Sequence, residues 1–596
     1  MTVTDELITS ESFDRLLAEA KALSRREEGR EITLKCEPAE IVRLAGVFRD
    51  DPELRFSFLS DIVYVDHYGQ PGNGARFELI YRAYNLDDYR RIHIRVPVPD
   101  GQSVDSVAGI WPAANWYERE AFDLMGFRFA NHPDPRRILL PSAFAGHPLR
   151  KDFPIGGEEV QFSVNWGEIE PQETMLDQCF EGMTWKEYVE RGDDIETEAG
   201  ASPLRKWAEE DRMIINMGPQ HPSTHGVLRL ALALEGETVL DAACDIGFLH
   251  TGIEKSAEQL MFQQALTLTD RMDYAGPLGD NLAYVLSVEK LLGIEVPPRA
   301  QALRVMLAEL TRIASHLLFL GTHALELGAV SVFLYCFQDR EQILDIFELA
   351  SGVRLMTSYI NIGGLRDDIP EGFSAKVREF LEYLPPKLVE YHALLTRNPI
   401  WLERTRGVGV ISVEDGIRMG VSGANIRGSG LKWDVRKAWP YSGYENYDFE
   451  IPTGSNGDVY DRYLVRMEEM RQSLRIVRQA LDNLPGGDYR ISDYKIVLPP
   501  RDRLAVSMEA VIHHFLVASR GFDVPAGDAY VSTESARGEM GFHVVSHGGP
   551  KPWRMKMRPP SFATLQALPK MVTGGMLADV VATVGSIDII LGEVDR

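Results

Sequence analysis

Cysteine is scarce in this sequence, and the few cysteines stand far apart. The chain of 596 residues has only four: Cys36, Cys179, Cys244 and Cys336. None forms a CxxC pair, so the spacing typical of zinc and iron–sulfur sites is missing, and so is the cysteine density of a disulfide-stabilised secreted protein. We therefore expect a chain that holds no metal or cluster by itself and works in a reducing compartment.

A surplus of positive charge is also missing. The formal net charge is −25 at pH 7, because 88 aspartates and glutamates outnumber 63 lysines and arginines. Such a chain is poorly suited to bind nucleic acid or to adsorb to anionic lipid, since both favour basic patches. The sequence also contains no Walker P-loop and no GxGxxG pattern after a strand, so it carries no nucleotide-binding signature.

Long hydrophobic runs are rare. The first residues, MTVTDELITSESFDRLL, are acidic and lack the apolar segment of a signal peptide. One stretch, residues 315–337, approaches transmembrane length, but it carries His316, His323 and Glu326, and charged groups are costly in the middle of a bilayer. The pattern favours a helix buried inside a large folded protein, with any membrane association made through partner proteins.

Length and composition predict at least two folded domains. The chain is too long for one ordinary core, and its 44% hydrophobic and 25% charged residues are typical of a globular protein. In the first ~190 residues, a size typical of one domain, the hydrophobic patterns predict three strands and a helix. The strands are Arg55–Asp66, Phe77–Tyr84 and Ile92–Val98; the helix carries Val104, Val107, Ala108 and Trp111 behind Ser103, a candidate N-cap.

The pattern of hydrophobic residues changes after residues 191–202. This acidic segment lacks apolar periodicity, which indicates a linker. From there on, long helical patterns dominate, with short strands among them, as in Pro298–Leu320, Tyr460–Leu484, Ile214–Ile215 and Val227–Leu234. We expect an α+β fold with a small mixed α/β domain (residues 1–187), a linker (188–210) and a large, mainly helical domain with small β-sheets (211–596).

The densest chemical signal is NMGPQHPSTHGVLR, which places His221 and His225 four residues apart in a loop rich in glycine and proline. Two imidazoles at this spacing suggest metal ligation, although the HExxH pattern is absent and no third ligand is close. A histidine in such a turn can instead present a proton donor to a bound ligand. A third interpretation is a structural turn whose imidazoles bind the backbone, and composition alone does not separate these interpretations.

A second signal is RMDY, where Tyr274 has a donor hydroxyl beside the charges of Arg271 and Asp273. Without other information, a structural salt bridge and a buried aromatic ring are the favoured interpretation. Glu326 is an acid in an otherwise apolar stretch, and a buried carboxylate must be paired, neutral or functional.

The N-terminal region carries charges with simpler interpretations. Glu118, Glu120 and Asp123 fall near a predicted helix start, where acidic groups interact favourably with the helix dipole. The segment HPLRKDFP is a basic loop bounded by prolines, which suits it to docking a partner better than to catalysis.

These segments together resemble a known family. NWYEREAFDLMGFRFANHPDPRRILLP and HPLRKDFP resemble the C-type component of bacterial respiratory NADH–quinone oxidoreductase, complex I. Eight further segments resemble the D-type component: NMGPQHPSTHGVLR, IGFLHTGIEK, DRMDY, VEKLLGI, SGYENYDFEIPTGSNGDVYDRYLVRMEEMRQSLRI, ESARGEMGF, PPSFATLQALP and GEVDR. The matches run from about residue 50 to the last residue, in family order, as in the fused C/D form of some bacteria.

The resemblance implies a fold and a division of labour. The D-type part is similar to the large subunit of nickel–iron hydrogenases, which hold their metal with two CxxC pairs. Here the corresponding places read HPSTHG and EVDR, and without soft thiolate ligands a nickel site is not expected. The resemblance implies no cofactor on this chain, with FMN and the iron–sulfur clusters on partner subunits and a quinone as substrate.

The resemblance also implies roles for single residues. In the family, the histidine of the PSTHG loop and the tyrosine of the RMDY segment contact the quinone headgroup; here they are His225 and Tyr274. An imidazole and a phenol at the two carbonyl oxygens supply hydrogen bonds and protons while electrons arrive from the terminal cluster of the B-type subunit. Supporting positions are His221, Glu326 and Asp273, and positions near the terminal cluster are Arg271, Met356 and Asn361.

Four positions depart from the family pattern. Glu326 stands for the usual aspartate partner of the quinone histidine, so the reach of its carboxyl group differs. Met356 replaces a histidine near the terminal cluster and cannot titrate. Asn361 replaces an arginine, and fewer positive charges there are expected to lower the cluster potential. His547 stands in SHGG where the family has SDG, a change that the sequence does not explain.

The predicted function is that of a peripheral-arm subunit of a proton-translocating respiratory complex, without a transmembrane segment of its own, on the cytoplasmic side of the plasma (inner) membrane. Its expected partners are the B-type, I-type and G-type peripheral subunits and the H-type membrane subunit. Two alternatives remain: a non-catalytic scaffold that bridges subunits, and a hydrogenase-like metalloenzyme.

Overall fold

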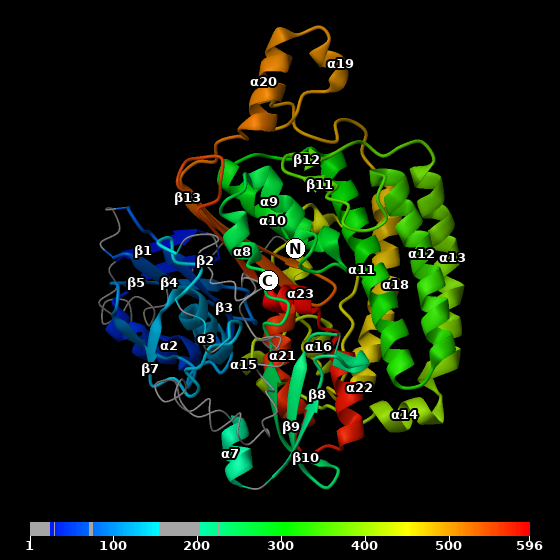
Figure 1. The fold of residues 1–596 in the computed structure, drawn as a ribbon. Coiled ribbons are helices and arrows are strands. Elements are labelled where there is room, and N and C mark those ends of the chain that lie inside the picture. The colour runs from blue at the N-terminus through cyan, green and yellow to red at the C-terminus, as the bar shows by residue number, and fades with distance from the viewer. Residues whose placement is uncertain are drawn as a thin grey trace, which may run out of the picture. The chain divides into compact units, whose positions relative to one another are not determined.

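The computed structural model describes residues 24–28, 30–70, 75–141, 144, 146–153, 203–210, 212–224 and 226–596 (Figure 1). The contacts divide the chain into two compact units. The first comprises Met1–Met217 and Arg229–Gly247, and the second comprises Gly218–Leu228 and Phe248–Arg596. The predicted linker signal at residues 191–202 and the candidate ligand His225 lie outside the described residues.

The first unit contains a five-stranded sheet in the order β1-β2-β5-β4-β3. Only β2 and β5 pair in parallel; the other neighbours are antiparallel. The predicted strands of this region are confirmed as β3, β4 and β5, and all residues of β3 and β4 are buried. The strands are β1 (Ser24–Glu28), β2 (Glu31–Lys35), β3 (Phe58–Asp66), β4 (Phe77–Tyr84) and β5 (Arg91–Val98), and the helices beside them are α2 (Ile41–Asp50) and α3 (Ala114–Met125).

The helix predicted around Val104–Trp111 is wrong. Its first residues form β6 (Ser103–Asp105), which pairs in parallel with β7 (Arg128–Ala130), and turns follow. The Glu118 carboxyl group accepts the Ser106 hydroxyl at 2.5 Å and the Val107 N–H at 2.8 Å, and this fixes the turn. Tertiary pairing therefore outweighs the local helical spacing.

The helix-dipole interpretation of the α3 acids is also wrong. The first turn of α3 contains no acidic residue, and Glu118, Glu120 and Asp123 are all fully buried. Asp123 accepts three backbone N–H groups of residues 138–140 and pairs with Arg137 at 2.7 Å. The acids therefore organise the loops that follow the helix.

A second, three-stranded sheet of the first unit has the order β10-β9-β8. It consists of β8 (Met213–Met217), β9 (Arg229–Glu235) and β10 (Thr238–Asp245), which confirms the two short strands predicted here, and α7 (Pro203–Glu209) precedes it. Trp207 of α7 is buried and donates to Asp241 of β10 at 3.2 Å. Gly247 packs on Leu139: a Cβ at this glycine would lie 2.1 Å from the Leu139 carbonyl oxygen.

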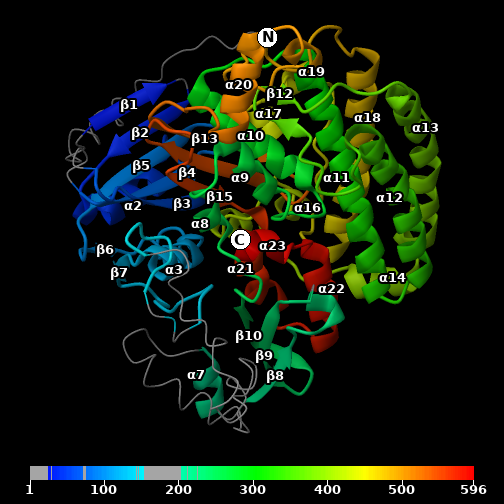
Figure 2. The ribbon, with the colours of Figure 1, turned by 45° about the horizontal axis from the view of Figure 1, so that its top comes forward.

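Long helices form the body of the second unit. Figures 1 and 2 both show four of them running alongside one another: α11 (Pro298–Glu326), α12 (Val330–Ser351), α13 (Phe373–Tyr391) and α18 (Val459–Asp482). The predicted helices at 298–320 and 460–484 are thereby confirmed. Their apolar faces enter one core with buried residues such as Leu307, Leu317, Leu384 and Met470.

The sequence predicts one helix over the apolar stretch 315–337, but the stretch consists of the end of one helix and the start of the next. α11 ends at Glu326 and α12 begins at Val330, because Gly328 adopts the left-handed backbone with φ +90°. Part of the stretch is buried, but Leu325, Val330, Leu334 and Tyr335 are exposed. Within the described part of the chain, no helix has the length and apolar character needed to cross a membrane.

The second unit also contains a three-stranded antiparallel sheet, on which α10 (Pro277–Leu292) packs. It consists of β13 (Gly527–Glu534), β14 (Glu539–Ser546) and β15 (Arg554–Arg558). A two-stranded ribbon pairs β11 (Ile360–Asn361) with β12 (Gly364–Leu365). The other helices are α8 (Ile253–Ala257), α9 (Phe262–Thr269), α14 (Pro399–Thr405), α15 (Val413–Arg418), α16 (Ala424–Gly428), α17 (Val435–Ala438), α19 (Arg501–Leu504), α20 (Met508–Ser519), α21 (Pro560–Val572), α22 (Leu577–Ile587) and α23 (Leu591–Asp595).

Candidate functional site

The histidine loop enters the second unit as a tight turn that contacts α22. Gly218 has φ +85°, and a Cβ there would lie 2.0 Å from the Leu228 carbonyl oxygen, so only glycine fits. The ring of His221 accepts the Ser223 N–H at 3.2 Å, and the Thr224 hydroxyl donates to the His221 carbonyl at 2.9 Å. In this arrangement His221 shapes the turn.

Tyr274 lies in the turn between α9 and α10 and is 37% exposed, whereas its neighbours Met272 and Asp273 are fully buried. Partial burial raises the pKa of the phenol above its ordinary value of 10, which the positive charge of Arg537 opposes. Tyr274 is therefore protonated at neutral pH and presents a hydroxyl that can donate a hydrogen bond.

The Asp273 carboxylate fixes this turn. It accepts the backbone N–H groups of Ala275 and Gly276 at 3.1 and 3.0 Å, and it pairs with Arg537, which follows β13, at 2.5 Å. A Cβ at Gly276 would lie 2.7 Å from the carboxylate, so the turn closes tightly around it. The structure thus pairs Asp273 with Arg537 and not with Arg271, whose side chain is about half exposed and 4.0 Å from Asp270.

Further carboxyl groups gather behind Asp273. Asp280 accepts the Asp273 N–H at 2.9 Å, and burial, with the charges of Asp273 and Glu593, raises its pKa well above the ordinary range. Burial and Asp273 also raise the pKa of Glu593 to about 7. Arg537 reaches Asp588 at 3.6 Å. Sequence reasoning missed Arg537, Asp280 and Glu593, although ESARGEMGF and GEVDR contain two of them and are rich in charge and glycine.

Glu326 is the last residue of α11, and its side chain is 10% exposed. Burial raises the pKa of its carboxyl group to about 8. The structure brings His323 to it, with 3.9 Å between His323 Nδ1 and Glu326 Oε2. Since His225 lies outside the described residues, the expected approach of His225 to Glu326 or to Tyr274 stays a prediction.

Met356 lies in the segment that joins α12 to β11, and Asn361 is the last residue of β11. Met356 has φ +53°, and Asn361 donates to the Ser358 carbonyl at 3.0 Å. The Ser358 hydroxyl donates to Asp270, so this segment touches the residue before Arg271. The three positions expected near the terminal cluster thus belong to neighbouring segments. His547, the fourth residue that differs from the family pattern, lies elsewhere in the unit. Its ring stacks on that of Trp553, with 4.2 Å between the ring centroids.

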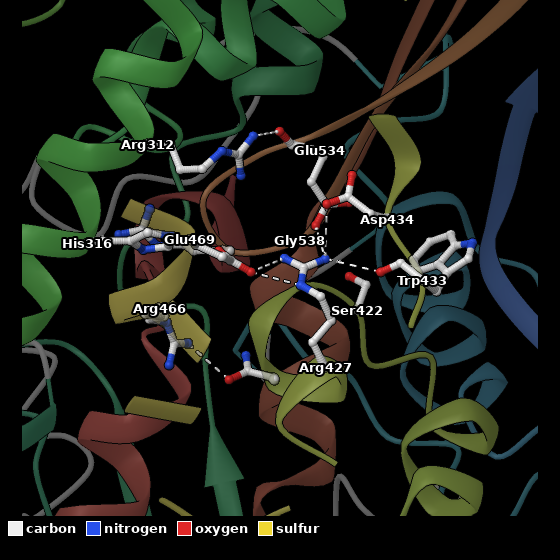
Figure 3. Close-up of polar contacts among 12 residues, drawn as sticks. Arg312, His316, Ser422, Arg427, Trp433, Asp434, Arg466, Glu469, Glu534 and Gly538 are labelled. Atoms are coloured by element: carbon white, nitrogen blue, oxygen red, sulfur yellow. Dashed lines mark hydrogen bonds and ion pairs between the residues drawn. The ribbon is translucent and has the colours of Figure 1, made fainter. Parts of the chain in front are cut away.

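A buried charge network that sequence reasoning missed connects the long helices to β13 (Figure 3). Arg427 of α16 pairs with Glu469 of α18 at 2.6 Å and with Glu534 at 2.7 Å, and the His316 ring shares a hydrogen bond with Glu469 at 2.8 Å. Arg312 donates to the Glu534 backbone carbonyl at 2.6 Å. Since the desolvation of buried ions is compensated only where they are paired, the network fixes α16, α18 and β13 relative to α11.

A small cavity adjoins this network. Its lining includes Gly276, Thr311, Arg312, Thr533 and Glu534. The cavity has room for about one water molecule, so a quinone ring cannot enter it.

The described residues do not offer a set of metal ligands. No three histidine, cysteine, aspartate or glutamate side chains in the described ranges are grouped to hold a metal ion. Cys36 and Cys336 are free, and burial raises the pKa of their thiols to about 12. These thiols are therefore protonated at neutral pH.

Comparisons with known proteins cover nearly the whole chain. Residues 34–159 match the family described as "Respiratory-chain NADH dehydrogenase, 30 Kd subunit", and residues 326–596 match "Respiratory-chain NADH dehydrogenase, 49 Kd subunit". The C/D subunit of NADH-quinone oxidoreductase from Gluconacetobacter diazotrophicus is 42% identical over 94% of this chain and 91% of the relative. Its counterpart from Methylococcus capsulatus is 40% identical over 94% and 93%. The D 2 subunit of NADH-quinone oxidoreductase from a Roseiflexus species is 58% identical over 65% of this chain and 94% of the relative.

Proposed function

Because this chain belongs to the family of fused C/D subunits of NADH-quinone oxidoreductase, an oxidoreductase that acts as a complex, we propose that its second unit forms the quinone-reduction site. In this proposal, Tyr274 and His225 hold the two carbonyl oxygens of the quinone headgroup. The observation that carries it is the presentation of Tyr274: a protonated phenol, 37% exposed, on a turn that the buried Asp273–Arg537 pair fixes.

The phenol has two tasks in the reaction. Quinone reduction requires two electrons and two protons, and negative charge develops on the carbonyl oxygens. A positioned hydroxyl stabilises that charge through a hydrogen bond and can donate a proton. Arg537 assists because its positive charge opposes the rise of the phenol pKa and so favours the loss of the proton.

The electrons are proposed to come from the terminal tetranuclear iron–sulfur cluster of the B-type subunit. Arg271, Met356 and Asn361 are the residues expected to face that partner. The contact of Ser358 with Asp270 supports this assignment, since it brings the two segments that carry these residues together. FMN and the remaining clusters are assigned to other partner subunits.

The wider assignment follows from the same family membership. We place the chain at the peripheral arm of a proton-translocating respiratory complex, on the cytoplasmic side of the plasma membrane, beside B-, I-, G- and H-type subunits. We also propose that the second unit shares the architecture of the hydrogenase large subunit without its metal. The absence of cysteine from HPSTHG and from GEVDR supports a site without nickel.

Replacing a single hydroxyl tests the quinone site. In the assembled complex, Tyr274→Phe should lower quinone reduction by about 10²-fold, the contribution of one positioned proton donor. NADH–ferricyanide activity should stay within about twofold, because it does not use this site. The matched control is Tyr68→Phe, at a 51% exposed tyrosine of the first unit, which should change neither activity.

The two activities separate the possible outcomes. An equal loss of both in Tyr274→Phe indicates an assembly defect and contradicts a role specific to quinone. Full retention of quinone reduction contradicts the proposal directly and favours a protein that only bridges its partners.

A further inference from the structure

The C-terminal end of α11 places two buried titratable side chains side by side. His323 Nδ1 lies 3.9 Å from Glu326 Oε2, and His323 is fully buried. Neither ring nitrogen of His323 nor Glu326 Oε2 has a hydrogen-bond partner in the described part of the chain. Buried polar groups without partners are costly and rare, so such a pair is a candidate for function.

Three elements hold the pair in place. Within α11, Phe319 stacks on the His323 ring at 5.5 Å between centroids, and Trp401 of α14 meets the same ring edge-on at 5.3 Å. Gly585 of α22 closes the remaining side. A Cβ at Gly585 would lie 2.1 Å from Glu326 Oε2 and 2.7 Å from His323 Nδ1, so α22 leaves no room for a side chain there.

The charges that face this pair are mainly positive. α18 contributes Arg462 and Arg466, and the Arg466 guanidinium lies 4.2 Å from the Phe319 ring centroid. Asp588, which follows α22, is 4.0 Å from Arg466. α12 contributes the thiol side chain of Cys336, which packs beside Gly321 one turn earlier in α11.

Both members of the pair are therefore neutral at pH 7. Burial, assisted by Arg466 and Arg462, lowers the pKa of His323 to about 3. Burial alone raises the pKa of Glu326 to about 8. The carboxyl group holds a proton, and the imidazole, which is not protonated further, keeps one N–H that can be placed on Nδ1, facing Glu326.

We propose that His323 is a positioning residue for the proton of Glu326, because its Nδ1–H is the hydrogen-bond donor available to the carboxylate after that proton leaves. The inference rests on the proposed quinone site, of which Glu326 is a supporting residue. When Glu326 releases its proton, the O–H bond breaks, the proton goes to an oxygen of the quinone that has received two electrons, and the negative charge stays on the carboxylate. A side-chain rotation that shortens the 3.9 Å separation by about 1 Å then forms the hydrogen bond.

Infrared spectroscopy of the assembled complex tests the inference. The carboxylic-acid C=O band of Glu326 is identified as the band lost in Glu326→Gln and is then followed against pH. In wild type it should titrate near pH 8. His323→Phe keeps a flat ring but removes the donor, so the midpoint should rise by about one pKa unit or more, the effect of one lost hydrogen bond to a charged group.

Two variants control for side effects. His323→Gln retains an N–H donor and should shift the midpoint less than His323→Phe does. His392→Phe, at a half-buried histidine bonded to Thr396 at 2.8 Å, should leave the Glu326 midpoint unchanged. The pH at which quinone reduction falls off should move in the same direction as the infrared midpoint.

The outcomes distinguish a failure of the inference from a failure of the proposed function. An unchanged midpoint in His323→Phe overturns the role of His323, even where Tyr274→Phe has lost quinone reduction. A raised midpoint supports it, even where Tyr274→Phe retains full activity and the quinone site itself is refuted. Should His323→Phe fail to assemble, His323→Gln decides: a midpoint close to that of wild type supports the inference, and a midpoint that rises by a full unit although an N–H donor is retained overturns it.

Discussion

Single buried charges determine how Tyr274 is presented. Asp273 accepts two backbone N–H groups of its own turn, but it is also fully buried, and Arg537 is its cationic partner at 2.5 Å. A buried ion pair contributes little net stability, yet the loss of one partner leaves an uncompensated charge. The orientation of the phenol therefore depends on a residue from a distant part of the sequence.

Arg537→Met should consequently destabilise the chain by about 3–5 kcal/mol, since Asp273 would lose its counter-charge in a dry site. Thermal or urea unfolding of the purified chain measures this. Arg271→Met is the matched control, because the Arg271 side chain is 54% exposed, and its effect should stay within about 0.5 kcal/mol. Equal stabilities of the two variants would contradict the role assigned to Arg537.

Glu593 gives a prediction with a definite pH window. Burial and Asp273 raise its folded pKa to about 7, above the value of 4.5 of an ordinary glutamate. Folding favours the protonated form, so the stabilising contribution is complete below pH 4.5 and is lost as pH rises through about 7. The free energy of unfolding should thus fall in wild type as pH rises from 5 to 8. Glu593→Gln should not show this fall, so its stability relative to wild type should increase with pH.

The control for this pH effect is Glu414→Gln, at a side chain that is 82% exposed. Its stability relative to wild type should not change over the same range. A constant difference between Glu593→Gln and wild type would mean that Glu593 does not hold a proton in the folded chain.

The residues of the site differ in how far the sequence could predict them. Tyr274 and Glu326 stand out locally, one as a phenol beside charges and the other as an acid in an apolar stretch. Their partners do not, because Asp273 and Arg537 are separated by 264 positions and only folding pairs them. The interpretation of Glu326 as paired, neutral or functional fits a carboxyl group that burial keeps protonated near neutral pH.

At the scale of elements, periodicity predicted what local sequence determines. The long helices α11 and α18 were expected because their apolar residues recur at helical spacing over more than twenty residues. The pattern at residues 103–111 is short, and there a strand pairing and the buried Glu118 decide the conformation. The break between α11 and α12 depends on one left-handed glycine, Gly328, within a run that remains apolar.

The contact of α22 with the end of α11 yields a prediction about elements. Gly585→Ala would place a methyl group 2.1 Å from Glu326 Oε2, so α22 or the carboxyl group must move. We expect a loss of about 1–3 kcal/mol in the free energy of unfolding, as for other overpacked sites, and a lower rate of quinone reduction. Gly486→Ala, at an exposed glycine with open space around its Cα, should change neither.

On the scale of the whole molecule, the chain passes between its two compact units more than once. Residues 213–217 and 229–247 follow the predicted linker but belong to the first unit, whereas residues 218–228 belong to the second. The position of the predicted domain boundary therefore differs from the grouping of contacts, and 188–210 as a linker stays a prediction. The D 2 relative from Roseiflexus matches 65% of this chain with 94% of its own length, so it is a shorter protein that corresponds to about two thirds of this chain.

Splitting the chain at residue 195 should therefore leave the two pieces associated. The second piece supplies β8, β9 and β10 to the first unit, where Gly247 lies so close to the Leu139 carbonyl that no side chain fits between them. The covalent link then serves mainly to raise the effective concentration of one piece near the other, and co-expression of the two pieces can replace it.

With a tag on the first piece only, affinity purification should recover both pieces in equal amounts. Gly247→Leu in the second piece should reduce that recovery, because a Cβ would lie 2.1 Å from the Leu139 oxygen, whereas Glu237→Leu, at an exposed position between β9 and β10, should not. Recovery of the tagged piece alone would show that the packing within the first unit is too weak to hold it together without the linker.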